Sequence, residues 1–248
     1  RARFCARGLA RAPFRQAGDR GRARSRRRAV KVLLLHAFPF DERMWEGYEG
    51  VAPRLYGRGE SIDGWAQQLA AEHDGPLAVV GASMGGYCAQ RLLAHADVRA
   101  LVLVGARAEP DPPERLPGRD ETIALLWEEG VEALWGRQRP ALFPEDADEG
   151  AVARAREIAL EQSAEELATA VAAMRDRPDS TGLVRETEAK VLVARGEHDP
   201  FLSGDEAEAL AASARNGRSH TFSGSGHLPS FERPEEFRLV VEEFLAGV

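Results

Sequence analysis

A serine within a G-x-S-x-G pattern is the residue of this chain that best fits a catalytic nucleophile. The pattern runs from Gly81 to Gly85, with Ser83 at its centre. A short apolar run over residues 77–80 precedes it, and a helical pattern begins near Met84. A serine at a sharp turn between a buried strand and a helix exposes its hydroxyl above the sheet, and small neighbours avoid collisions there. The spacing therefore predicts a nucleophile elbow at Ser83.

A serine hydroxyl needs a base to accept its proton and an acid to orient that base. Asp199 follows an apolar run over residues 191–194, and His227 follows a short predicted strand over residues 219–222. Because reactive groups gather at the carboxyl ends of parallel strands, Ser83, Asp199 and His227 should meet there. We expect Ser83 to attack, His227 to transfer the proton and Asp199 to orient His227.

Other residues compete for two of these roles. His198 and His36 are alternative bases, and Glu197 and Asp205 are alternative acids. His227 is favoured because His198 would have to share its turn with its own orienting acid. Cys88 lies on the predicted helix after Ser83, where we expect a small buried residue and not a nucleophile.

Backbone N–H groups should hold the negative charge that develops on the attacked carbonyl. The amide of Met84, directly after the serine, is one candidate donor, and the amide of Phe38, in a loop after the apolar run 30–35, is the other. Four side chains are candidate walls of the substrate pocket: Trp135, Met174, Phe201 and Leu228. The chain carries no HExxH, no CxxC and no GxGxxG after a strand, so we expect neither a metal nor a cofactor.

The elements around these residues alternate between strands and helices. Apolar runs predict strands over residues 30–35, 77–80, 98–104 and 191–194, and a further short strand is expected over 219–222. Helical patterns cover about 62–72, 84–95, 205–214 and 234–246. This alternation is typical of a parallel α/β sheet. Residues 107–188 interrupt it with an all-helical pattern, including a capping box at Ser163 and Glu166, and we interpret them as a lid over the sheet. The predicted domains are a core over 30–106 and 189–248, the lid over 107–188, and an arm over 1–29.

Charge divides the 248-residue chain unevenly. Residues 1–28 hold eleven arginines and one acid, so the overall net charge of −7 leaves −17 for the remainder. An acidic body argues against nucleic-acid binding through the folded part. The arm lacks an apolar core, so we expect disorder and a dispensable extension rather than a secretory signal or a functional tail. No run reaches the roughly 18 apolar residues of a membrane span, and a cytoplasmic protein with no membrane partner is expected.

Several segments together resemble one family. Residues 36–45, 81–86, 195–200 and 227–237 resemble the oxyanion loop, nucleophile elbow, acid turn and histidine segment of lid-bearing α/β-hydrolases. Within that family the chain looks most like 3-oxoadipate enol-lactonase-like hydrolases and small carboxylesterases, whose lid often ends in Arg-Pro-Asp-Ser, here residues 177–180. The resemblance covers about residues 31–247. It implies a mostly parallel sheet, an inserted helical lid, and cofactor-free hydrolysis of a small ester or lactone through an acyl-enzyme.

The resemblance leaves two alternatives open. The same triad could serve carbon–carbon bond hydrolysis or haloperoxidase-like perhydrolysis, or the fold could serve a non-catalytic small-ligand receptor. Epoxide hydrolases and dehalogenases are disfavoured because they would carry Asp where Ser83 stands. Family members usually begin with a β-hairpin, which the arm replaces here, and Ala37 stands for a usual glycine. Residues 50–61 resemble the family's next strand and G-x-G-x-S loop, with little room for a helix before them. Without the edge strands of the hairpin, an exposed sheet edge is expected.

Overall fold

The computed structural model describes residues 29–248, and the expectations for residues 1–28 lie outside this part of the chain. Its centre is a five-stranded sheet in which the strands neighbour one another in chain order and every pair is parallel. The strands are β1 (Lys31–Leu35), β2 (Leu77–Ala82), β3 (Val98–Val104), β4 (Lys190–Gly196) and β5 (Gly217–Phe222). The predicted α/β fold is confirmed, and the continuous apolar runs correspond to strands that are covered on both faces.

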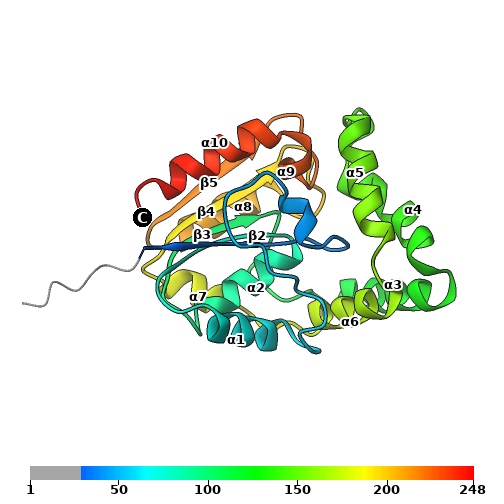
Figure 1. Ribbon diagram of the computed structural model, residues 1–248, viewed down its shortest axis with the longest axis horizontal. Helices are drawn as coiled ribbons and strands as arrows, with labels where there is room; N and C mark the ends of the chain where they lie inside the picture. Colours follow the sequence, from blue (N-terminus) through cyan, green and yellow to red (C-terminus); the bar gives the residue numbers. More distant parts are fainter. Residues whose placement is uncertain (1–28) are drawn as a thin grey trace, which may run out of the picture.

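Alternate residues of the strands feed two separate apolar cores. On one face, Leu33, Val79 and Leu101 pack with the crossover helices α1 (Ile62–Glu72), α2 (Met84–Leu92) and α8 (Gly204–Ser213), and with α7 (Thr181–Glu186). On the other face, Leu34, Val80 and Val102 pack against α10 (Pro234–Leu245), which follows the short α9 (Pro229–Glu232). Figure 1 shows α1, α2 and α7 on one side of the sheet and α10 on the other. All five strands therefore run in one direction and their carboxyl ends share one edge, with β1 to β4 largely buried and most of β5 exposed.

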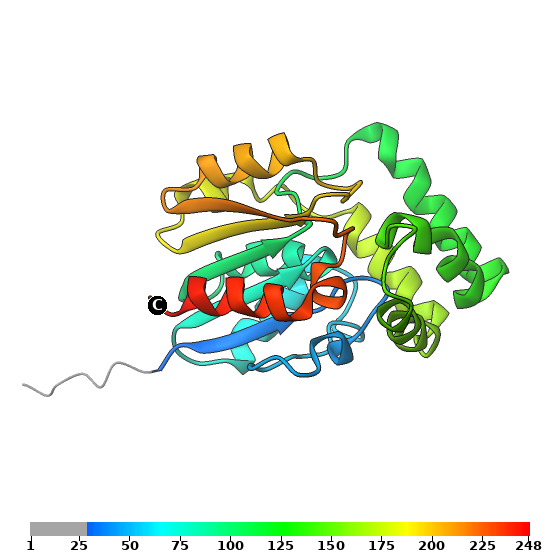
Figure 2. The same cartoon turned by 90° about the horizontal axis from the view of Figure 1, so that it is seen from above.

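Four helices between β3 and β4 form what we call the insertion. They are α3 (Leu116–Glu128), α4 (Gly130–Leu142), α5 (Glu149–Leu160) and α6 (Ala164–Arg175), preceded by the 3-10 turn η2 (Pro113–Arg115). Figures 1 and 2 show them beyond the end toward which the strand arrows point. Only half of the predicted capping box forms in this part of the chain. Ser163 Oγ accepts from the Glu166 amide, whereas the Glu166 carboxylate turns to Arg54. No helix within residues 29–248 is long and apolar enough to cross a bilayer.

The segment between β1 and α1 contains less regular secondary structure than the resemblance implied. After the 3-10 turn η1 (Glu42–Trp45), residues 46–61 contain no named helix or strand, and the expected strand is reduced to one bridge between Val51 and Leu33. Trp45, Tyr48 and Glu49 border this part of the sheet, and Leu34 and Val80 are buried beneath them and α10. A groove of about 290 Å³ remains there between β1 and α10, lined by Val32, Leu34, Val80, Phe237 and Val241 among others. β1 is the edge strand of the sheet within residues 29–248, and the expected loss of the hairpin before it lies outside these residues.

Candidate active site

Ser83 occupies a strained turn between β2 and α2. Its backbone has φ 48° and ψ −111°, and it is the one non-glycine residue with positive φ within residues 29–248. The Ser83 amide donates to the Val104 carbonyl at 2.7 Å, and the Ser83 carbonyl accepts from Gly86 and Tyr87. Such strain persists only where surrounding bonds over-determine it, and it concentrates at functional sites. The turn thus has the conformation of a nucleophile elbow.

Gly85 brings the first turn of α2 against the end of β1. A Cβ at Gly85 would lie 2.2 Å from the Leu35 carbonyl oxygen and 2.8 Å from that of His36, so no larger residue fits without displacing backbone. This close approach sets the loop after β1 beside the start of α2. Phe38 and Met84, the two residues predicted to supply oxyanion-binding amides, are both buried in the same apolar core.

Asp199 and His227 come together from the ends of β4 and β5. Asp199 Oδ1 lies 2.9 Å from His227 Nδ1, and both side chains are almost fully buried. The Asp199 carboxylate also accepts from the Phe201 amide at 2.8 Å. Apart from this ionic contact, neither His227 Nδ1 nor Asp199 Oδ2 has a hydrogen-bond partner among the described residues. Catalytic hydrogen bonds are often poorly aligned before substrate binds, and the short separation is the significant feature.

Gly105, at the end of β3, links this pair to Ser83. A Cβ on Gly105 would lie 2.6 Å from His227 Cε1 and 2.8 Å from Asp199 Oδ2, so the pair rests directly on its backbone. The preceding residue, Val104, is the one that accepts the Ser83 amide. The three residues predicted as a triad therefore surround the carboxyl end of one central strand.

Glu232 holds the loop that carries His227, and the motif analysis did not identify it. Its carboxylate accepts from the amides of Gly226 at 2.9 Å and Leu228 at 3.2 Å, and from Ser225 Oγ at 3.1 Å. Burial raises the pKa of Glu232, while these hydrogen bonds act in the opposite direction. The amides on both sides of His227 are thus tied to one carboxylate. A Glu five residues after the candidate histidine was the only signal in the sequence.

The competing residues have other surroundings. His36 is buried, and its Nε2 accepts from the Leu55 amide at 2.9 Å, which requires a neutral ring with an unprotonated Nε2. His198 is exposed, as are the alternative acids Glu197 and Asp205. Cys88 lies in the core, where burial raises the pKa of its thiol to about 12. None of these five residues meets the Gly105 backbone as Asp199 and His227 do.

The four predicted wall residues have different positions. The Phe201 ring packs edge-on against the His227 ring at 4.6 Å between centroids, and Leu228 is buried next to His227 in sequence. Trp135 packs on Phe143 within the insertion, with 6.4 Å between ring centroids. Met174 is buried in the core that α6 shares with the sheet. Phe201 is thus the member of this set that directly contacts a candidate catalytic side chain.

His36 should make the fold sensitive to mild acid. Burial lowers the pKa of His36 from 6.5 to about 4, against the hydrogen bond to the Ala37 carbonyl and the charge of Asp41, and the nearby Arg54 and Arg58 add to the lowering. Between pH 6.5 and 4, His36 is protonated in the unfolded chain but neutral in the folded chain. Stability is therefore lost as pH falls from about 6.5 toward 4. The free energy of unfolding in urea should fall by roughly 2 to 3 kcal/mol between pH 7.5 and 4.5 through this residue.

The matched comparison uses His36→Gln and His198→Gln. Gln cannot gain a proton in this range, so His36→Gln should flatten the decline between pH 7.5 and 4.5. His198→Gln replaces an exposed side chain, so this variant should show the same decline of stability with pH as the wild type. A His36→Gln variant that loses as much stability in acid as the wild type would contradict this account.

Comparison with known proteins agrees with this geometry. The model of the alpha/beta hydrolase family matches residues 32–238, and the chain belongs to that family. A comparison with curated protein sequences gave no match. Among solved structures, a thermophilic esterase from Thermogutta terrifontis is 27% identical with a TM-score of 0.78, covering 88% of this chain and 90% of that one.

Two further structures share the fold at lower identity. The enol-lactonase from Burkholderia xenovorans LB400 is 21% identical with a TM-score of 0.76, covering 89% of this chain and 93% of its own. A bromoperoxidase from Bacillus anthracis is 16% identical with a TM-score of 0.72, covering 88% and 92%. These likenesses establish the architecture, and the resemblance to enol-lactonase-like esterases predicted from the motifs is confirmed.

Proposed function

We propose that this protein is a serine hydrolase that cleaves a small ester or lactone. The observation that carries the proposal is the Asp199–His227 pair, with Oδ1 and Nδ1 2.9 Å apart, seated on Gly105 beside the strained turn of Ser83. A strained serine, a histidine and an acid that orients it are the parts that acyl transfer requires. The 27% identity to the Thermogutta esterase supports an ester-like substrate.

Each residue has one role in the proposed reaction. Ser83 Oγ attacks the carbonyl carbon while His227 Nε2 takes its proton, and Asp199 holds His227 in the tautomer that leaves Nε2 free and stabilises the imidazolium. The Phe38 and Met84 amides donate to the oxyanion of the tetrahedral intermediate. His227 then protonates the leaving alkoxide. Water, activated by the same histidine, attacks the acyl-enzyme and releases the acid.

The insertion acts in this proposal as the lid of the active site. Its helices stand beyond the carboxyl ends of the strands (Figure 2). The His227 amide donates to the carbonyl of Leu142, the last residue of α4, at 3.1 Å, so the insertion touches the histidine loop directly. The acyl group would then lie between the sheet and the insertion. Phe201 and Leu228 line the side nearest His227, with Trp135 and Met174 as further candidate walls.

Two measurements on the wild-type protein test the proposal. A serine-directed fluorophosphonate should add one label to the intact protein, on the peptide that contains Ser83. Panels of short-chain aryl esters and small lactones should show turnover, and their relative rates would rank esters against lactones. Labelling without turnover would support Ser83 as the nucleophile and would favour carbon–carbon cleavage or perhydrolysis over ester hydrolysis. If the protein shows no labelling and no turnover, the proposal is contradicted and a ligand-binding receptor is favoured.

A further inference from the structure

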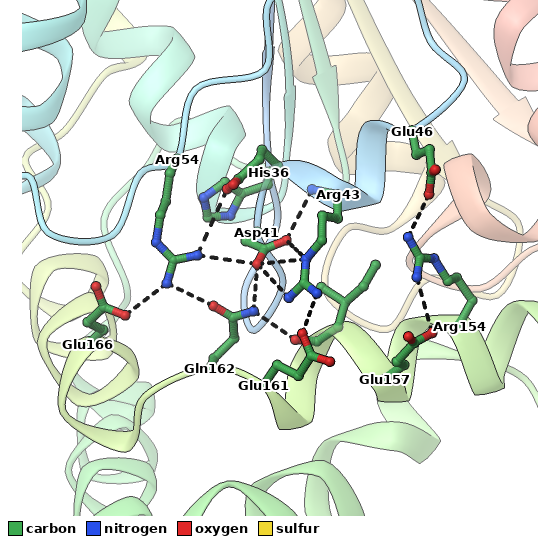
Figure 3. A network of polar contacts seen from close by, with 12 residues as sticks. His36, Asp41, Arg43, Glu46, Arg54, Arg154, Glu157, Glu161, Gln162 and Glu166 are labelled. Atoms are coloured by element: carbon green, nitrogen blue, oxygen red, sulfur yellow. Dashed lines mark hydrogen bonds and ion pairs between the residues drawn. The ribbon is translucent and has the colours of Figure 1, made fainter.

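Asp41 is a buried carboxylate at the centre of a polar network between the insertion and the loop after β1 (Figure 3). It is 3% exposed. Its Oδ2 accepts from Arg43 at 2.8 Å, from Arg54 at 3.2 Å and from Gln162 at 2.8 Å. Burial alone would raise the pKa of Asp41, but hydrogen bonds from Arg43 and Gln162 outweigh it and lower the pKa to about 2. Asp41 therefore stays ionised under ordinary conditions.

Gln162 brings the insertion into this network. It lies in the turn between α5 and α6, is 5% exposed, and also donates to the carbonyl of Ile158 at 2.7 Å. Its Oε1 accepts from Arg54, which also donates to the Glu166 carboxylate on α6 at 2.9 Å. One neutral side chain thus spans from the insertion to Asp41 with both of its polar atoms bonded. A buried hydrogen bond to a charged group is among the stronger polar contacts of a protein.

On its other side Asp41 closes the compact loop that contains Phe38. Its Oδ1 caps η1 by accepting from the Arg43 amide at 3.0 Å, and its carbonyl accepts from the Met44 amide. Met44 Sδ in turn accepts from the Ala37 amide, and the Ala37 carbonyl accepts from the Phe40 amide. Movement of Asp41 is therefore transmitted to the residues on both sides of Phe38.

The ion pairs that join α5 and the residue after it to residues 43–46 lie at the surface. Arg154 on α5 contacts Glu46 at 2.6 Å and Glu157 at 3.1 Å, and these three side chains are 37%, 75% and 58% exposed. The ion pair of Arg43 with Glu161 is also at the surface. Exposed ion pairs contribute little because water and salt screen them. The contact of Gln162 with Asp41 is thus the buried polar link between the insertion and the loop, beside the apolar packing of Ala155, Ile158 and Ala159 on α5 in the core that also contains Phe40 and Met44.

We propose that Asp41 is a positioning residue for the Phe38 amide in the oxyanion hole. Because Gln162 holds Asp41, the position of the insertion on the sheet determines the position of that amide. This inference rests on the proposed hydrolase function. Closure of the insertion over a substrate would then complete the oxyanion hole. The coupling passes through a contiguous set of hydrogen bonds from Gln162 to Asp41 and η1.

The test compares Gln162→Met with Arg154→Gln. Met keeps the size of Gln162 but cannot donate to Asp41, whereas Arg154→Gln removes two exposed ion pairs and leaves Asp41 untouched. In Gln162→Met, hydrogen exchange of the amides in residues 37–45 should quicken about tenfold. Its kcat and its rate of fluorophosphonate labelling should fall about tenfold with little change in KM, measured below the unfolding temperature. Arg154→Gln should match the wild type in all three readouts.

Two outcomes would overturn the inference. Unchanged exchange over residues 37–45 in Gln162→Met would show that the insertion does not hold the loop. Faster exchange with unchanged kcat and labelling would show a structural link that does not position the Phe38 amide. Should the wild-type protein neither label nor turn over any substrate, the hydrolase proposal fails, while the exchange experiment still decides whether Gln162 and Asp41 hold the loop.

Discussion

Ser83→Ala is expected to lower turnover of the best ester or lactone by about 1,000-fold or more, because no other group can form the acyl-enzyme. The variant should also lose its fluorophosphonate label entirely. Ala differs from Ser by one oxygen atom, and the Ser83 side chain makes no capping hydrogen bond to α2, so the fold should be retained. Ser213→Ala is the matched control. It removes a hydroxyl that bonds only to the Leu210 carbonyl at the end of α8, and activity should be unchanged.

The same series separates a working triad from three residues that merely lie close together. In a functional triad the members act as a unit, so His227→Gln should cost nearly as much as Ser83→Ala. The double variant should then be no slower than either single variant. Costs that multiply in the double variant would show that Ser83 and His227 act independently. Turnover that survives Ser83→Ala would contradict the proposed nucleophile.

The strands and the candidate catalytic residues were predictable because their signals are local. A strand covered on both faces reads as an uninterrupted apolar run, and the prediction for residues 98–104 has the bounds of β3. Glycines around Ser83 show where backbone approaches closely, as at Gly85 against β1. Since parallel strands place their carboxyl ends at one edge, residues that follow separate apolar runs could be assigned to one site.

Features that depend on contacts between distant segments could not be predicted. Glu166 caps its helix less than expected because Arg54, from another loop, attracts its carboxylate. Trp127 follows the apolar pattern of its helix yet is 60% exposed, since no element of residues 29–248 buries it. The contact of Gln162 with Asp41 joins residues 121 positions apart in the chain. No periodicity or motif marks such pairs, and only the packing of the insertion on the sheet brings them together.

Gly105→Ala is expected to lower activity and labelling by about 100-fold without removing any reactive atom. The added Cβ would lie 2.6 Å from His227 Cε1 and 2.8 Å from His227 Nδ1 and Asp199 Oδ2, so the pair must move. A displacement of about 1 Å at a catalytic group costs on the order of 100-fold in rate. The φ of 59° at Gly105 adds backbone strain of roughly 1 kcal/mol for any residue with a Cβ.

Gly136→Ala provides the matched control for this substitution. Gly136 lies within α4, and a Cβ there would meet nothing within 4 Å. Ala has the better helix propensity, so this variant should keep full activity and gain up to about 1 kcal/mol of stability. Circular dichroism during heating would show whether Gly105→Ala remains folded at the assay temperature. A folded Gly105→Ala variant that labels and turns over at the rate of the wild type would mean that the position of the Asp199–His227 pair does not govern the chemistry at Ser83.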